Sequence, residues 1–236
     1  MFKELLAVLR GRGADDDLSR PFIEMLNRSG ERVRAAGARL HHTEASSAGL
    51  EEFQRLDVQI NKLQRRIRKR VLVYLTGRAN APDLPYCLQL MSLVKDVERI
   101  GDYAKDIANL ERFAPPAVKA GEDPLGDRLL ELREHVEALI LESPTIFEAG
   151  DQQRALEFIR GSRAVEDRGR ELLERLAEQP LDPLRHAGRI LATQYYRRIL
   201  AHALNVLSSL VAPLHRLDYY DEKDLLAELR SAPPAR

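Results

Sequence analysis

The chain has 236 residues, which is enough for one large domain or two small ones. Its 37 basic and 37 acidic side chains cancel, so no overall basic excess points to nucleic acid as a partner. The single cysteine, Cys87, excludes a disulfide framework and fits a reducing cytoplasm, and no apolar run approaches the roughly 18 residues of a membrane span.

The first half of the chain predicts three long helices and almost no strand. The short amphipathic start, "MFKELLAVLR", is expected to form a small packing helix, with contact to a membrane or a partner as the alternative. The first long helix runs from Leu18 to about His42. Its arginine-rich stretch "ERVRAAGARLHH" is expected to be mostly a solvated face. The second helix ends at Gly77, and the turn "GRANAPDLP" leads into the third. Apolar residues recur at three- and four-residue steps on both helices, as Phe53, Leu56, Ile60, Leu63, Ile67, Val71 and Tyr74, then as Leu90, Leu93, Val94, Val97, Gly101, Ala104 and Ala108.

A proline-rich segment at residues 114–126 separates these helices from a second set. The second set is expected to comprise one helix from about Asp127 to Ala149 with Pro144 inside it, one from the N-cap Asp151 to about Glu178, one from Pro183 to Val211, and a short terminal helix in "DEKDLLAELR". The sequence therefore predicts an all-α protein of two tandem three-helix bundles with short extra helices at the termini. The first bundle takes residues 1–113 and the second takes residues 127–236.

Acidic side chains recur at helical spacing in "VKDVERIGDYAKDI", where Glu98, Asp102 and Asp106 lie four residues apart. On the second helix, Asp57 and Asn61 each follow an apolar stripe residue by one position, as Glu98 and Asp102 do on the third. Two helices joined by a short turn pack antiparallel, so these flanks meet. Equal distance from the turn places Asn61 opposite Glu98 and Asp57 opposite Asp102. The register therefore predicts three carboxylates and one amide beside the seam between the two helices.

Such a patch of oxygen donors suits a hard cation such as Mg²⁺, Mn²⁺, Ca²⁺ or ferric iron. Asp106 lies further round its helix and is expected to be at most an outer ligand. The alternative is that these acids are solvated or form weak ion pairs, as most acidic residues on helix surfaces do. The residue pattern by itself leaves both interpretations open.

The string "DVERIGDYAKDIA" resembles the signature of the PhoU family, bacterial regulators of phosphate signalling, whose motif carries two acids four residues apart. Glu98 and Asp102 take the places of those acids, and Tyr103 stands where the family often has histidine. The segment "LDVQINKLQRRI" is similar to the family's preceding helix, with Asp57 and Asn61 in its two polar positions. The resemblance covers most of the chain, because the family has two three-helix repeats.

The second repeat departs from the family pattern. Alignment of "YYRRILAHALNVL" with "DVERIGDYAKDIA" puts Arg197, Ala201 and Asn205 where the first repeat has its three acids. On the preceding helix, Ser162 and Glu166 take the two polar positions. Glu166 is predicted to face Arg197, so that an ion pair stands where a metal would otherwise bind.

By this resemblance the chain is expected to be a cytoplasmic helical adaptor, peripheral to the inner membrane, rather than an enzyme. Family members repress phosphate-starvation signalling and restrain phosphate uptake by contacting the PstB ATPase of the Pst phosphate transporter and the sensor kinase PhoR. The implied cofactor is a divalent or ferric metal ion in the first repeat, and the implied partners are such an ATPase or kinase, with a homodimer also left open. No nucleic acid is expected.

Two alternatives remain. The first is a generic helical interaction scaffold that binds no metal, and the second is a carboxylate-bridged metal enzyme. The enzyme is disfavoured because none of the six histidines has an acid three residues before it, which the Glu-x-x-His pattern of ferritin-like bundles requires.

Overall fold

The computed structural model describes residues 15–40, 47–77, 84–110, 123–178 and 183–217. These residues form six long helices, one 3₁₀ turn and no strand, which confirms the all-α prediction. The helices are α2 (Asp15–Leu40), α3 (Ser47–Thr76), α4 (Leu84–Asn109), α5 (Pro124–Ala149), α6 (Gln152–Glu178) and α7 (Pro183–Ser208), followed by the turn η2 (Leu214–Arg216). The short helices predicted at the two termini lie outside the described residues, as does most of the predicted linker.

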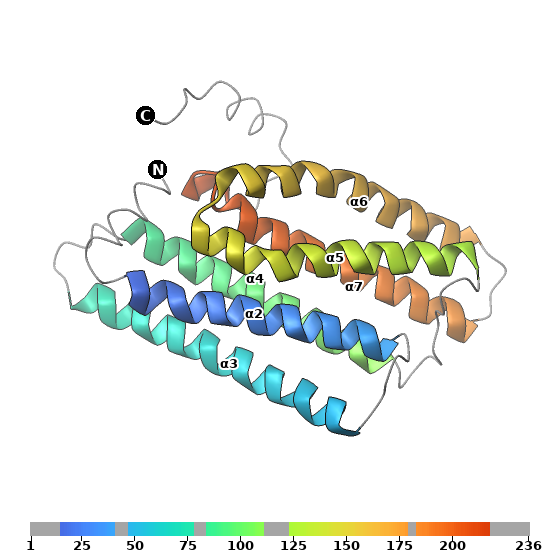
Figure 1. The fold of residues 1–236 in the computed structure, drawn as a ribbon, viewed down its shortest axis with the longest axis horizontal. Helices are drawn as coiled ribbons and strands as arrows, with labels where there is room; N and C mark the ends of the chain where they lie inside the picture. The colour runs from blue at the N-terminus through green and yellow to red at the C-terminus, as the bar shows by residue number, and fades with distance from the viewer. Residues whose placement is uncertain (1–14, 41–46, 78–83, 111–122, 179–182, 218–236) are drawn as a thin grey trace.

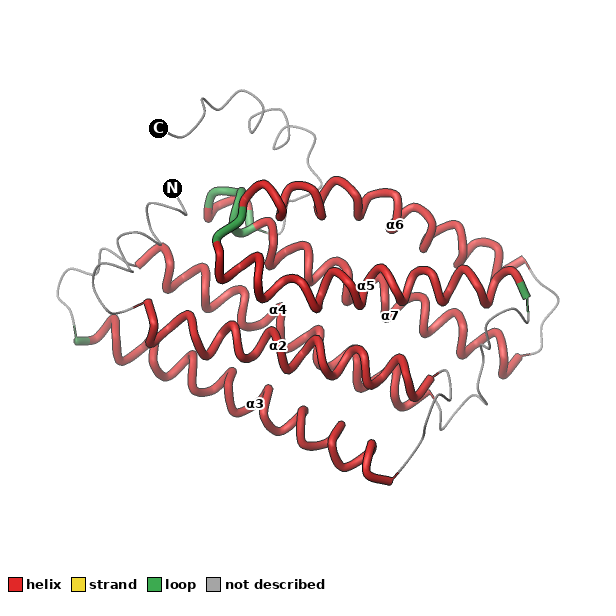
Figure 2. The backbone as a smooth tube through the Cα atoms, in the orientation of Figure 1, coloured by secondary structure: helices red, strands yellow, loops and turns green. Residues whose placement is uncertain are grey.

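Two sets of three helices lie side by side (Figure 1). In the first set α3 packs on α2 and α4, and in the second α6 packs on α5 and α7. The sets join where α2 meets α5 and α4 meets α7, so that α3 and α6 form opposite outer edges of the molecule. All six helices run roughly along the long axis, and the described loops between them are short (Figure 2).

The apolar stripes predicted from the sequence form the core. On α3, six of the predicted stripe residues, from Phe53 to Val71, are buried. Their counterparts on the other helices join them in one continuous cluster that extends through both sets. Because the two three-helix sets share this core, burial of apolar surface stabilises them as a single body rather than as two separate bundles.

Helix α5 begins at Pro124, three residues earlier than the sequence predicts. Asp123 is the N-cap, and its Oδ1 accepts hydrogen bonds from the backbone N–H groups of Leu125 at 3.0 Å and Gly126 at 2.9 Å. Proline is favoured at the first position of a helix because its missing N–H has no partner there in any case. The helix then continues unbroken through Pro144 to Ala149.

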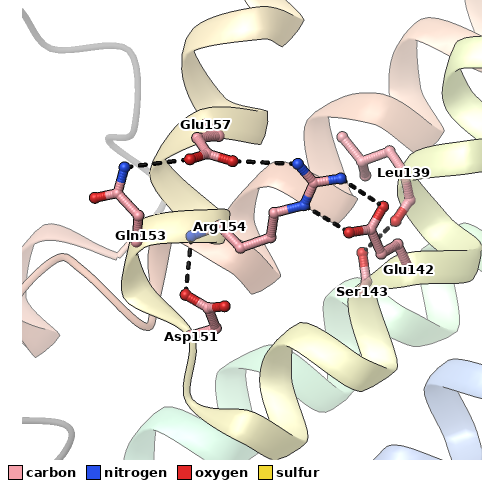
Figure 3. Close-up of polar contacts among 7 residues, drawn as sticks. All are labelled: Leu139, Glu142, Ser143, Asp151, Gln153, Arg154 and Glu157. Atoms are coloured by element: carbon pink, nitrogen blue, oxygen red, sulfur yellow. Dashed lines mark hydrogen bonds and ion pairs between the residues drawn. The ribbon is translucent and has the colours of Figure 1, made fainter.

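The turn between α5 and α6 is held by a polar network (Figure 3). Gly150 closes α5 in the left-handed region, with φ at 62°, and Asp151 Oδ1 accepts a hydrogen bond from the backbone N–H of Arg154 at 3.0 Å. The guanidinium of Arg154 donates to both oxygens of Glu142 on α5, at 2.6 and 3.1 Å, and to Glu157 on its own helix at 3.1 Å. This bidentate pair joins the first turn of α6 to the last two turns of α5.

None of the helices in the described ranges is long and apolar enough to cross a membrane.

Candidate functional site

Two contacts show how α3 and α4 meet beside the predicted acidic residues. A Cβ added at Gly101 would lie 3.3 Å from Cδ1 of Ile60, so these two positions are level across the seam. One turn further along, Lys105 Nζ on α4 lies 3.8 Å from Asp57 Oδ2 on α3. Asp57 therefore stands level with the part of α4 that carries Asp102.

Arg32 also lies in this region, on α2, the remaining helix of the first set. Its side chain is only 2% exposed, and its Nη1 lies 2.5 Å from Asp57 Oδ1. The guanidinium carbon stands 4.7 Å from the centre of the Phe53 ring, within cation–π distance. Gly101 of α4 borders the guanidinium, since a Cβ added there would lie 3.6 Å from Arg32 Nη1, at ordinary van der Waals distance. The buried guanidinium therefore occupies the space between the two acidic flanks.

Arg32 was not among the predicted site residues, because the arginine-rich stretch of the first helix was expected to be mostly solvated. For Arg32 that expectation is wrong. A signal was present in the spacing: Arg32 lies three residues after Ser29 and four before Ala36, both of which are fully buried. That spacing places Arg32 on the inward face of α2.

The charges around Arg32 perturb one another. Burial lowers the pKa of Arg32, and Asp57, Asp102 and Asp106 oppose that shift. Burial raises the pKa of Glu98, and the nearby charge of Asp102 raises it further. The pKa of Asp106 is raised by the same two causes in the same order. Three of the acids, Asp57, Asp102 and Asp106, thus act on one buried cation. The positive charges near Glu98 are instead those of Arg99, Arg68 and Lys95.

As placed, these side chains do not fit a metal ion. In the described ranges no group of three or more histidine, cysteine, aspartate or glutamate side chains is arranged to hold one. Asp57 is taken by Arg32, and Arg99 pairs with Asp102 at 3.3 Å and with Glu98 at 3.9 Å. Metal binding by Asp57, Asn61, Glu98 and Asp102, with Asp106 as an outer ligand, therefore stays a prediction of the sequence.

In the second set, the residues aligned with the acids of the first set make different contacts. Arg197 lies across Gly169 of α6, where an added Cβ would be 3.0 Å from its Cγ, and its Nη1 donates to Gln194 at 3.1 Å. The predicted ion pair between Glu166 and Arg197 stays a prediction. Ser162 is buried, and Ala201 is half-buried.

Asn205 belongs to a polar contact between the two sets, which the sequence did not indicate. Asp96 of α4 is nearly buried, and its Oδ1 accepts a hydrogen bond from Nδ2 of Asn205 at 3.0 Å and lies 2.8 Å from Nδ1 of His202. The His202 ring stacks on Tyr103, with 5.8 Å between centroids, and Tyr103 also meets Tyr195 at 5.9 Å. Polar and aromatic groups thus fasten α4 to α7 in one register.

Comparison with known proteins gives a consistent picture. Residues 22–110 match the PhoU domain. The chain is 28% identical over 171 residues to the phosphate-specific transport system accessory protein PhoU homolog of Pseudomonas aeruginosa, a match that covers 69% of each chain. It is 29% identical over 181 residues to the protein of the same description from Pseudomonas putida, which covers 73% of this chain and 68% of the relative. The fold is similar to the crystal structure of PhoU from Pseudomonas aeruginosa, with a TM-score of 0.70, 24% identity, and coverage of 92% of this chain and 99% of that one.

Proposed function

We propose that this chain is a member of the PhoU family and, from that premise, an accessory regulator of phosphate transport. The observation that carries the proposal is the match of residues 22–110 to the PhoU domain, together with two curated relatives described as accessory proteins of phosphate-specific transport. The family consists of regulatory accessory proteins rather than enzymes.

The fold suits an adaptor, because it is a rigid body with two separate outer faces. The shared core and the contact of Asp96 with His202 hold the two sets together. The buried pair of Arg32 and Asp57 joins α2 to α3 within the first set. The two outer helices, α3 and α6, therefore offer separate surfaces on one body to which partners can bind (Figure 1).

The finer part of the proposal concerns the partners. We place this chain on the cytoplasmic ATPase subunit of a phosphate transporter, on a phosphate-sensing kinase, or on both, where it restrains uptake and signalling when phosphate is plentiful. The support is that both relatives are described as accessory proteins of phosphate-specific transport. A generic helical scaffold remains the alternative function class.

A reporter experiment separates the two. The gene is deleted in its own host, and expression from a phosphate-starvation promoter is measured in phosphate-rich medium. We expect the reporter to be induced in the deletion strain and silenced again by the wild-type gene. A reporter that stays silent after deletion would refute the proposal and favour the scaffold. Co-purification with the tagged ATPase subunit, compared with an unrelated transporter ATPase of the same host, then tests the partner.

A further inference from the structure

The outward side of α3 carries an unusual concentration of positive charge. No aspartate or glutamate occurs between Asp57 and Asp83, whereas residues 62–70 contain six lysines and arginines. The whole chain has no net charge, so this segment departs sharply from the average surface. Such a run is usually neutralised by acids on neighbouring helices or faces a negatively charged partner.

Neighbouring acids do not neutralise the outermost basic residues. Lys62, Arg65, Arg66 and Lys69 are all exposed, and within the described part of the chain none of the four forms an ion pair. Their spacing of three and four residues places them along one line of the helix. Helix α3 packs on α2 and α4 with its other side, and it forms the lower edge of the molecule in Figure 1.

The same line continues into exposed apolar side chains. Leu72 and Val73 are 59% and 62% exposed, and they follow Lys69 at three- and four-residue steps. Leu84 and Leu88, at the start of α4, are about half exposed at the same end of the molecule (Figure 1). Four of the seven large apolar side chains that are exposed in the described residues thus gather at this end, which marks an interaction site rather than scattered surface residues.

A basic stripe that runs into an aliphatic end matches the layers of an anionic bilayer surface. Lysine and arginine bind headgroup phosphates, and leucine and valine enter the boundary between headgroups and acyl chains. The line from Lys62 to Thr76 is straight and about 21 Å long at 1.5 Å per residue, so all of it can touch a plane at once. A nucleic acid backbone would complement the charges but would leave the leucines and valine in water.

We propose that the outer face of α3, from Lys62 to Thr76, together with Leu84 and Leu88, docks on an anionic phospholipid surface. Each basic residue near such a surface strengthens binding about fivefold. Removal of two of them is therefore expected to weaken binding about 25-fold. The proposal concerns contact with lipid and does not depend on which protein partner the chain regulates.

Vesicle flotation with the full chain tests this docking. We expect binding to vesicles of phosphatidylglycerol mixed with phosphatidylcholine, no binding to phosphatidylcholine alone, and a steep loss at high salt. The variant R65Q/R66Q should bind about 25-fold more weakly. The matched control R160Q/R168Q removes two exposed charges from α6, the opposite outer helix, and should bind like the parent. The variant L72S/V73S should lose the part of binding that survives moderate salt.

Two further probes keep the test decisive, namely a short DNA duplex and polyglutamate in solution. Circular dichroism of each variant confirms that the helices are intact. Equal vesicle binding by the parent, R65Q/R66Q and the α6 control would overturn the proposal. Absence of vesicle binding, with DNA or polyglutamate bound through Arg65 and Arg66, would also overturn it and assign the face to a polyanionic macromolecule. Either result would leave the reporter test of the proposed function unchanged, because that test measures the effect of deleting the whole gene.

Discussion

Replacement of Arg32 by methionine is expected to destabilise the protein by about 3 kcal/mol. Removal of one partner from a fully buried ion pair costs about 3 to 5 kcal/mol, because the other charge is left uncompensated. Here Arg32 is buried, but Asp57 is 26% exposed and has Lys105 at 3.8 Å, so water and lysine recover part of that cost. We therefore take about 2 kcal/mol for the pair. Loss of the contact with the Phe53 ring adds about 1 kcal/mol.

Equilibrium denaturation of a double-mutant cycle isolates the pair from the packing. The variants are Arg32→Met, Asp57→Asn and the two combined, and we expect a coupling energy of about 1 to 3 kcal/mol. Arg28→Met is the matched control, because Arg28 pairs with Glu31 on the surface of the same helix at 3.0 Å. That control should cost less than about 0.5 kcal/mol. A coupling energy below about 0.5 kcal/mol would refute the reasoning, since Arg32 would then not depend on Asp57.

The same variant tests the predicted metal site. With Arg32 gone, the acids lose their buried cation, and a hard cation such as Mn²⁺ can take its place. We expect Arg32→Met to bind Mn²⁺ more tightly than the parent in a calorimetric titration, and to lose that gain when Glu98→Ala and Asp102→Ala are added. Equal Mn²⁺ affinity in all three proteins would show that the carboxylates do not act as ligands.

Three further predictions concern pH, capping and the second set. Because burial raises the pKa of Glu98, the contribution of this side chain to stability is present below pH 4.5 and is lost as the pH rises through the raised pKa. The variant Glu98→Gln should therefore show a smaller fall in unfolding free energy above pH 4.5. An unchanged slope of unfolding free energy against pH would contradict this. Asp123→Ala should lower the free energy of unfolding by about 2 kcal/mol, because it removes an N-cap and an ion pair with the buried Arg189. Asp151→Ala, which removes an exposed N-cap alone, should lower it by about 1 kcal/mol or less. Equal losses would argue against a role for the ion pair with Arg189. Arg197→Ala should destabilise the second set by about 0 to 1 kcal/mol, and a cycle with Glu166→Ala that shows no coupling would reject their predicted pairing.

Alignment of the second repeat on the first predicts where a residue lies along its helix but not which residue it contacts. Alignment places Asn205 where the first repeat has Asp106, and both lie on the third helix of their set. In the structure Asn205 donates to Asp96 in the other set, so its role comes from the contact between sets. Correspondence within a repeat therefore predicts position along a helix, but not the partner that packing brings there.

Local pattern determined most of the architecture. The three- and four-residue steps of apolar side chains predicted the helices, because a single helix must turn one face to the core wherever it lies. The Asp123 cap was missed, which shortened predicted α5 by three residues, because Asp123 and Pro124 were assigned to the proline-rich linker.

From the sequence by itself, Asp57 and the acids of α4 were predicted to lie level beside one seam, because a short turn keeps the two helices antiparallel neighbours. Only the tertiary structure decided that Arg32 would stand among them and that Asp96 would meet His202. The first contact joins consecutive helices, and the second joins helices of different sets. Spacing along one helix indicates which face is buried, but the partner that meets each side chain is set by the packing of the whole core.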